Sequence, residues 1–277
     1  MCVYTVVAFL LVLVISKENC LNEQSTVYYE AEDWIVTDIP NGTYLSMCSD
    51  LDILPPNTSN EASDDDEGLI FVIKRNGTGP DVMVLSMNGT YLHGWGEGLL
   101  VKPHALRIQT TNQTSFVWIV DQMDETVKQF SLTGELVLTL GQSGTAGNTT
   151  DPLLFDRPTD ISFDPYNRFA YISEGEGDTN QLTKVDLQNG VFNATRLGSG
   201  VTGSGVGEFH KAHSIEYDVL TVQAEAHGSE SKQSVLIVSD ELNNRVQFIS
   251  PENGTTLYLP WAQQCEVEMP SSTSPTL

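Results

Sequence analysis

This 277-residue chain has few positively charged residues compared with its negatively charged ones. Lys and Arg number 13 against 37 Asp and Glu, which gives a formal net charge of −24 at pH 7. Recognition of a nucleic-acid backbone needs a basic surface that neutralises phosphates, and docking on anionic lipid needs the same kind of surface. The composition therefore argues against nucleic acid and anionic membranes as partners.

Apolar runs long enough to cross a bilayer are also missing. Residues 3–15 form a nearly apolar run of 13, whereas a transmembrane helix needs about 20. The run fits the hydrophobic region of a signal peptide, although the preceding Met1-Cys2 carries no basic side chain. A short buried helix is the alternative. We interpret 1–16 as a signal peptide, and we expect the mature chain to be secreted, extracellular and without a membrane span.

Cysteine is limited to four residues, and no two of them form a Cys-x-x-Cys pair. This spacing argues against a zinc or redox site built on cysteine pairs. Once Cys2 leaves with the signal peptide, Cys20, Cys48 and Cys265 remain. Three cysteines allow one disulfide, for which Cys48 and Cys265 are the candidates, or a bridge to another chain.

Asparagine is abundant in one particular context. Eight of the sixteen asparagines begin an Asn-x-Ser/Thr triplet, the acceptor for N-linked glycans. The eight are Asn41, Asn57, Asn76, Asn88, Asn112, Asn148, Asn193 and Asn253. Several stand in Asn-Gly pairs, so they also fit turns. Both interpretations place them on exposed loops, and we expect a glycoprotein.

An internal repeat organises the chain. His104, Thr159 and His213 occupy the same position in three copies and lie 55 and 54 residues apart. A weaker copy spans 70–95. Each copy contains four short β-branched or aromatic runs separated by turn residues. Such repeats are typical of the blades of a β-propeller. The alternative, a β-sandwich, does not repeat so regularly. We expect an all-β propeller of about four four-stranded blades.

The remaining segments break this pattern. We expect an N-terminal segment over 17–44, the propeller over 45–261 and a disordered tail over 262–277. An acidic stretch within 55–68 is interpreted as a solvated loop. Its carboxylates could alternatively bind calcium, but their spacing matches no known calcium loop.

The repeats resemble those of the NHL-repeat family over 45–261. The resemblance is carried by Phe-Asp-Arg-Pro at 155–158, by residues 205–213 and by Asn-Asn-Arg-Val-Gln-Phe at 243–248. The secreted NHL repeat-containing glycoproteins resemble the chain most. More distant is the lyase domain of the peptide-amidating enzyme, which cleaves peptidyl-α-hydroxyglycine. Such propellers usually have six blades, so the resemblance implies that the four seen here are an incomplete copy.

Two histidines are the main candidates for a metal site. His104 and His213 begin the inner strands of their blades, and inner strands line a propeller channel. Converging imidazoles can bind zinc, and the resemblance to the lyase implies this role. The third histidine of that motif has no counterpart here. The alternative is that each imidazole makes a structural hydrogen bond.

The same resemblance implies a catalytic pair. Arg75 matches the lyase arginine that contacts substrate, and a guanidinium there would stabilise a carboxylate or alkoxide. Glu176 stands at the position of the catalytic tyrosine. A carboxylate can act as a base, but a surface turn is the alternative role.

These observations lead to one main hypothesis. We expect a secreted, glycosylated NHL-repeat propeller that binds an extracellular protein or peptide, without catalysis or a definite cofactor. The alternative is a zinc-dependent peptidylamidoglycolate lyase-like enzyme, in which His104 and His213 hold zinc while Arg75 and Glu176 act on substrate. A third possibility is that the chain folds poorly on its own.

Overall fold

The computed structural model describes residues 36–40, 43, 47–56, 67–111, 114–188, 192–223 and 230–257. The predicted signal peptide, most of the N-terminal segment, the acidic stretch and the predicted tail lie outside these residues. Within the described part, no helix is long and apolar enough to cross a membrane.

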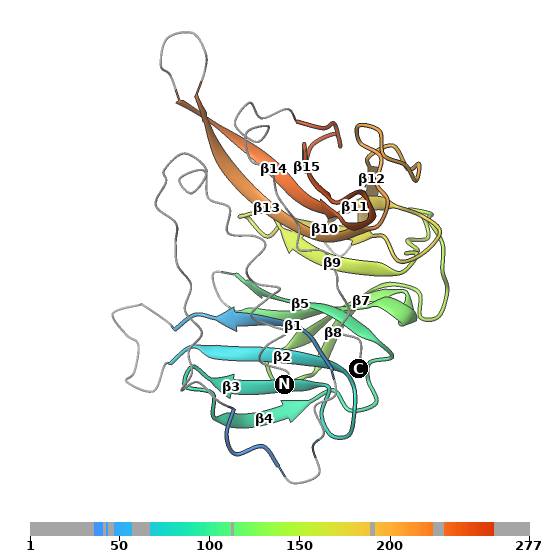
Figure 1. The fold of residues 1–277 in the computed structure, drawn as a ribbon. Coiled ribbons are helices and arrows are strands. Elements are labelled where there is room, and N and C mark those ends of the chain that lie inside the picture. Colours follow the sequence, from blue (N-terminus) through green and yellow to red (C-terminus); the bar gives the residue numbers. More distant parts are fainter. Residues whose placement is uncertain are drawn as a thin grey trace, which may run out of the picture.

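The described chain folds into four antiparallel sheets (Figure 1). The first sheet consists, in spatial order, of β1 (Met47–Leu54), β2 (Leu69–Asn76), β3 (Val82–Ser86) and β4 (Tyr91–Trp95). The second consists of β5 (Pro103–Thr110), β6 (Ser115–Asp121), β7 (Thr126–Ser131) and β8 (Leu136–Gly141), with the 3-10 turn η1 (Gln122–Asp124) between β6 and β7.

The other two sheets form the upper half of Figure 1. The third consists of β9 (Pro158–Phe163), β10 (Phe169–Glu174), β11 (Gln181–Asp186) and β12 (Asn193–Leu197). The fourth consists of β13 (Ala212–Gln223), β14 (Glu230–Asp240) and β15 (Arg245–Ile249), with η3 (Glu241–Asn243) between the last two.

The first strands of successive sheets, β1, β5, β9 and β13, are neighbours in this order. Four antiparallel sheets joined through their first strands form a β-propeller, so the predicted fold class is confirmed. Two details differ from the expectation. The first sheet begins with β1, which lies before the weak copy at 70–95, and the fourth sheet has three strands within the described residues, followed by a single bridge between Ile249 and Thr256.

Alternating side chains of the blade-centre strand β6 pack against two different neighbouring sheets. In β6, Val117 and Ile119 belong to the core shared with the first sheet. Trp118 and Val120 point to the opposite face and join the core shared with the third sheet. All four are fully buried or nearly so. A strand that is apolar at every position is therefore required in the middle of a blade, as Phe-Val-Trp-Ile-Val at 116–120 provides.

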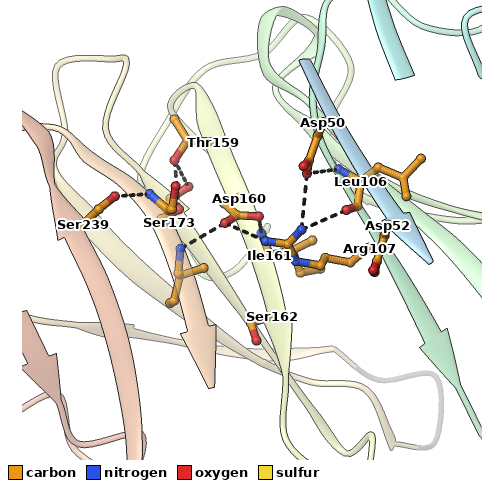
Figure 2. Close-up of polar contacts among 12 residues, drawn as sticks. Asp50, Asp52, Leu106, Arg107, Thr159, Asp160, Ile161, Ser162, Ser173 and Ser239 are labelled. Carbon is orange, nitrogen blue, oxygen red and sulfur yellow. Dashed lines mark hydrogen bonds and ion pairs between the residues drawn. The ribbon is translucent and has the colours of Figure 1, made fainter. Parts of the chain in front are cut away.

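The inner strands β5 and β13 each have one edge without a strand partner, and side chains of the preceding sheet accept N–H groups along that edge. Leu106 N–H donates to Asp50 Oδ2 at 2.9 Å (Figure 2). Ile108 N–H donates to Asp52 Oδ2 at 2.8 Å. The Arg107 guanidinium then joins Asp50 on one side to Asp160 on the other, at 3.3 Å each. Polar side chains thus connect three sheets.

The same arrangement recurs between the third and fourth sheets. Ile215 N–H donates to Asp160 Oδ2 at 3.0 Å, and Tyr217 N–H donates to Ser162 Oγ at 2.9 Å. A buried N–H without an acceptor costs about 1–3 kcal/mol. These side chains therefore contribute to the stability of the fold.

A second repeated contact fixes the loops. The second strands of the last three sheets end in the fully buried carboxylates Asp121, Glu174 and Asp240. Each accepts hydrogen bonds from the loop that enters its sheet, as Asp121 does from the N–H groups of Val101 (2.9 Å) and Lys102 (2.7 Å).

The other two carboxylates behave alike. Asp156 N–H donates to Glu174 and His210 N–H donates to Asp240. A cation also pairs with each of the three carboxylates: Lys128 with Asp121, Arg196 with Glu174, and Arg245 with Asp240.

The first sheet departs from this rule. Its equivalent position holds Lys74, also fully buried, whose Nζ donates to the carbonyl oxygens of Thr78 (2.7 Å) and Gly79 (3.1 Å). The turn after β2 is therefore fixed by a donor where the other sheets use an acceptor.

We predict that Asp121→Ala lowers the free energy of unfolding by about 3 kcal/mol, because it removes two loop acceptors and one of the carboxylates around the buried Lys128 ammonium. Chemical denaturation measures the change. Asp186→Ala is the control, since its partner Arg168 is half exposed and surface ion pairs contribute little. Equal losses in both variants would contradict the assignment.

Candidate functional site

Two imidazoles meet at the end of the propeller where the inner strands begin. The rings of His104 on β5 and His213 on β13 lie 4.9 Å apart in an edge-to-face arrangement. The intervening strand β9 places Thr159 at the equivalent position. Its small side chain is fully buried, and its hydroxyl donates to the Ala212 carbonyl at 2.9 Å. A small residue on the middle strand is what lets the two imidazoles approach each other.

Glu176 joins the two histidines. Ligand atoms of His104, Glu176 and His213 all lie within 4.8 Å of one another. The Glu176 carboxylate also accepts from Lys211 Nζ at 2.9 Å, and the same ammonium bonds Glu241 at 2.9 Å. We call these five side chains, together with Arg75, the channel mouth.

Arg75 reaches the mouth from the end of β2. Its Nε donates to the Pro103 carbonyl at 3.2 Å, next to His104. Burial lowers the pKa of the Arg75 guanidinium, and the nearby Glu176 carboxylate offsets part of this effect. The structure therefore brings together all four residues that the sequence proposed for metal binding or catalysis. Their chemical roles stay predictions.

Burial keeps both imidazoles neutral. It lowers the pKa of His104 to about 2, and the neighbouring His213 and Arg75 add to the effect. Burial also lowers the pKa of His213, although the Glu241 carboxylate, 3.8 Å from Nε2, opposes it. A neutral imidazole keeps a lone pair for a metal ion or a hydrogen-bond donor.

A cavity of about 550 Å³ lies between the inner strands, and His104 and His213 form part of its wall. Its lining also includes Arg107 with its partners Asp50 and Asp160 (Figure 2), and Glu216. Burial raises the pKa of Asp50 and of Glu216 to about 7, while Arg107 opposes both shifts.

Sequence reasoning missed these cavity residues. The available signal was positional, because Arg107 and Glu216 each stand three positions after the repeated histidine of their copy. Charge on a strand that was expected to line a channel could have indicated the network. Its partners could not be named, because they come from other sheets.

Four of the eight predicted glycan acceptors have side chains among the described residues. Asn88, Asn148, Asn193 and Asn253 are exposed. The described part of the chain does not include Asn41, Asn57, Asn112 or the side chain of Asn76. Cys48 is buried on β1, and its proposed partner Cys265 lies outside the described residues.

The neutral state of His104 predicts a pH dependence. Below the ordinary histidine pKa of 6.5, the unfolded chain gains a proton that the folded chain does not bind, so the free energy of unfolding decreases as pH falls. His104→Gln removes this contribution. The advantage of the natural chain over the variant should shrink by about 1 kcal/mol between about pH 7.5 and about pH 5.5.

Denaturation at several pH values measures this difference. Asp50 and Glu216 have raised pKa values, so their contribution to the free energy of unfolding changes with pH in the opposite direction. This contribution is common to both chains and cancels when they are compared. Parallel profiles for the two chains would contradict the neutral, buried state of His104.

No protein-family model matches the chain. Curated proteins of similar sequence do exist. The chain is 29% identical over 201 residues to NHL repeat-containing protein 3 of Mus musculus, covering 71% of this chain and 52% of that protein. It is 28% identical over 216 residues to the Homo sapiens protein of the same name, covering 76% and 56%. The chain thus spans about half the length of these relatives.

Among solved structures, an auxiliary nutrient binding protein from Bacteroides thetaiotaomicron is 15% identical, with a TM-score of 0.46, and the match covers 77% of this chain and 47% of that one. The relatives confirm the resemblance that the repeat motifs indicated, and the four sheets agree with it. The chain is therefore a β-propeller whose repeats are similar to those of NHL repeat-containing protein 3.

Proposed function

We propose that this chain is a secreted, N-glycosylated NHL-repeat propeller that binds an extracellular protein or peptide at the channel mouth without catalysing a reaction. The observation that carries the proposal is the convergence at this mouth of charged and imidazole side chains from four sheets, above a cavity of about 550 Å³. Polar groups that converge over a cavity are typical of ligand sites.

A binding role fits the state of the mouth better than catalysis does. Glu176, at the position of the lyase tyrosine, is already paired with Lys211. Lys211 is shared with Glu241, and Arg75 is bonded to a backbone carbonyl. These charged groups therefore already have hydrogen-bond or ion-pair partners within the protein. A bound ligand would replace some of these partners.

Secretion and glycosylation are supported by the sequence. The apolar run at 3–15 fits a signal peptide, and four of the eight glycan acceptors lie exposed. In two of them, Asn88 and Asn253, the carboxamide oxygen accepts the hydroxyl of the threonine two residues later, at 2.9 and 2.8 Å.

Selection from a random linear peptide library displayed on phage tests the binding role. We expect the secreted chain to enrich specific peptides. Lys211→Glu should weaken their binding about tenfold or more, because it reverses the charge between Glu176 and Glu241. Arg168→Glu is the matched control, since it reverses an ion-paired cation away from the mouth. Failure to enrich any peptide would overturn the proposal.

A second function is favoured by one specific observation. His104, Glu176 and His213 supply two neutral nitrogens and a carboxylate oxygen within 4.8 Å of one another, a donor set that zinc accepts with a position left open. The residues therefore fit the ion that the lyase resemblance implies. A bound zinc would act as a Lewis acid. Arg75 would orient an anionic substrate group, once Glu176 exchanged Lys211 for the metal.

Elemental analysis of the secreted chain tests this alternative. It predicts about one zinc per chain, lost in His213→Ala because two ligands alone bind weakly. His93→Ala is the control, since His93 is exposed on β4. No zinc in the folded natural chain, or equal zinc in both variants, would remove the metalloenzyme interpretation.

A further inference from the structure

Resting on the proposed binding function, we infer that the partner is a polypeptide segment with two groups of apolar side chains and a basic residue between them. The apolar groups would dock on two platforms beside the channel mouth. The first platform consists of Leu99, Val101 and Met123 of the second sheet. The second consists of Val201, Val206 and Leu242 of the fourth sheet.

The repeat places three side chains at equivalent positions around the mouth. Met123, Glu176 and Leu242 each stand two residues after the buried carboxylate that ends the second strand of their sheet. In an antiparallel sheet, the turn after the second strand lies at the same end as the start of the first strand. Met123 and Leu242 therefore lie at the same end as His104 and His213, and the sheet between them contributes Glu176.

Loops that enter the second and fourth sheets complete the platforms. In the first, Gln122 N–H donates to the Lys102 carbonyl at 3.1 Å, which ties the Met123 turn to the loop that carries Leu99 and Val101. In the second, Leu242 N–H donates to the His210 carbonyl at 3.0 Å. The two platforms are thus built from the same parts of two different repeats.

All six platform side chains are exposed. Their exposed fractions lie between 43% and 63%, although each is apolar and belongs to an ordered turn or loop. Single exposed apolar residues are ordinary, but groups of them at one end of a molecule mark interaction surfaces.

Both platforms are held in place before any partner binds. The Asp121 carboxylate accepts the N–H groups of Val101 and Lys102. In the fourth sheet, the Arg245 guanidinium donates to the carbonyl oxygens of Ser204, Gly205 and Glu208 at 2.7 to 2.9 Å. A surface fixed in this way loses little conformational entropy on binding.

Charge between the platforms selects the centre of the partner. The Glu241 carboxylate is 41% exposed, whereas the Lys211 side chain that bridges it to Glu176 is only 23% exposed. The chain as a whole carries a formal charge of −24. The formal charges of the mouth balance, because Lys211 and Arg75 offset Glu176 and Glu241, but Glu241 is the more exposed of its two carboxylates. An exposed carboxylate beside two apolar platforms complements a lysine or arginine flanked by apolar residues, and the net charge of the chain disfavours an acidic partner.

The phage-displayed peptide library provides the test. Peptides selected on the natural chain should combine Leu, Val, Met or aromatic residues with Lys or Arg. Their binding should fall about tenfold or more on the double variant Met123→Asp/Leu242→Asp, because each change places a carboxylate where an apolar side chain docks. The matched control is Leu136→Asp/Val137→Asp, which alters two apolar residues that are also exposed, on the outer strand β8. Thermal denaturation verifies that both variants fold.

The possible outcomes separate the two proposals. Loss of binding in Met123→Asp/Leu242→Asp, but not in Leu136→Asp/Val137→Asp, supports the platforms. If selected peptides lose binding in Lys211→Glu but keep it in Met123→Asp/Leu242→Asp, the binding function stands and the platforms are wrong. Acidic or wholly polar selected peptides would overturn the partner chemistry. If no peptide is enriched, both proposals fail.

Discussion

Carboxylates that accept backbone N–H groups hold this molecule together. A propeller exposes the inner edge of every sheet to a channel, where no strand can supply the missing acceptors. Asp50, Asp52 and Asp160 supply them between sheets, and Asp121 and Asp240 accept N–H groups of the loops that enter their own sheets. An unmet buried N–H costs more than a hydrogen bond contributes, so the spacing of the sheets depends on these side chains. Part of the acidity of the chain is thus structural.

The same contacts position the proposed site. Asp240 holds the loop that leads to His213, and Asp121 holds the loop that leads to His104. Thr159 leaves room for the imidazoles to approach, and Glu176 follows the buried Glu174 in the sheet between them. The channel mouth is therefore a product of the repeat itself. Substitutions at the fixing carboxylates should be judged as changes to the site as well as to stability.

The repeat made much of this predictable. The spacing of His104 and His213 implied equivalent places in two sheets, and from this the sequence placed both at the channel. It did not reveal β1, because Cys-Ser-Asp-Leu-Asp-Ile at 48–53 alternates charge with apolar residues and lacks the apolar run of the other copies. Nor could it pair Arg107 with Asp50 and Asp160. Those contacts depend on the register between sheets, which no pattern within one strand determines.

Lys74 has a consequence for how freely these sheets can be exchanged. Where the other repeats bury an acceptor, the first buries an ammonium that bonds to its own turn. A first sheet moved into the second place would bring a cation against the N–H groups of Val101 and Lys102, donor facing donor. The repeats are therefore not interchangeable modules. An engineer who shuffles or duplicates these blades must move each buried charge together with the loop it was matched to.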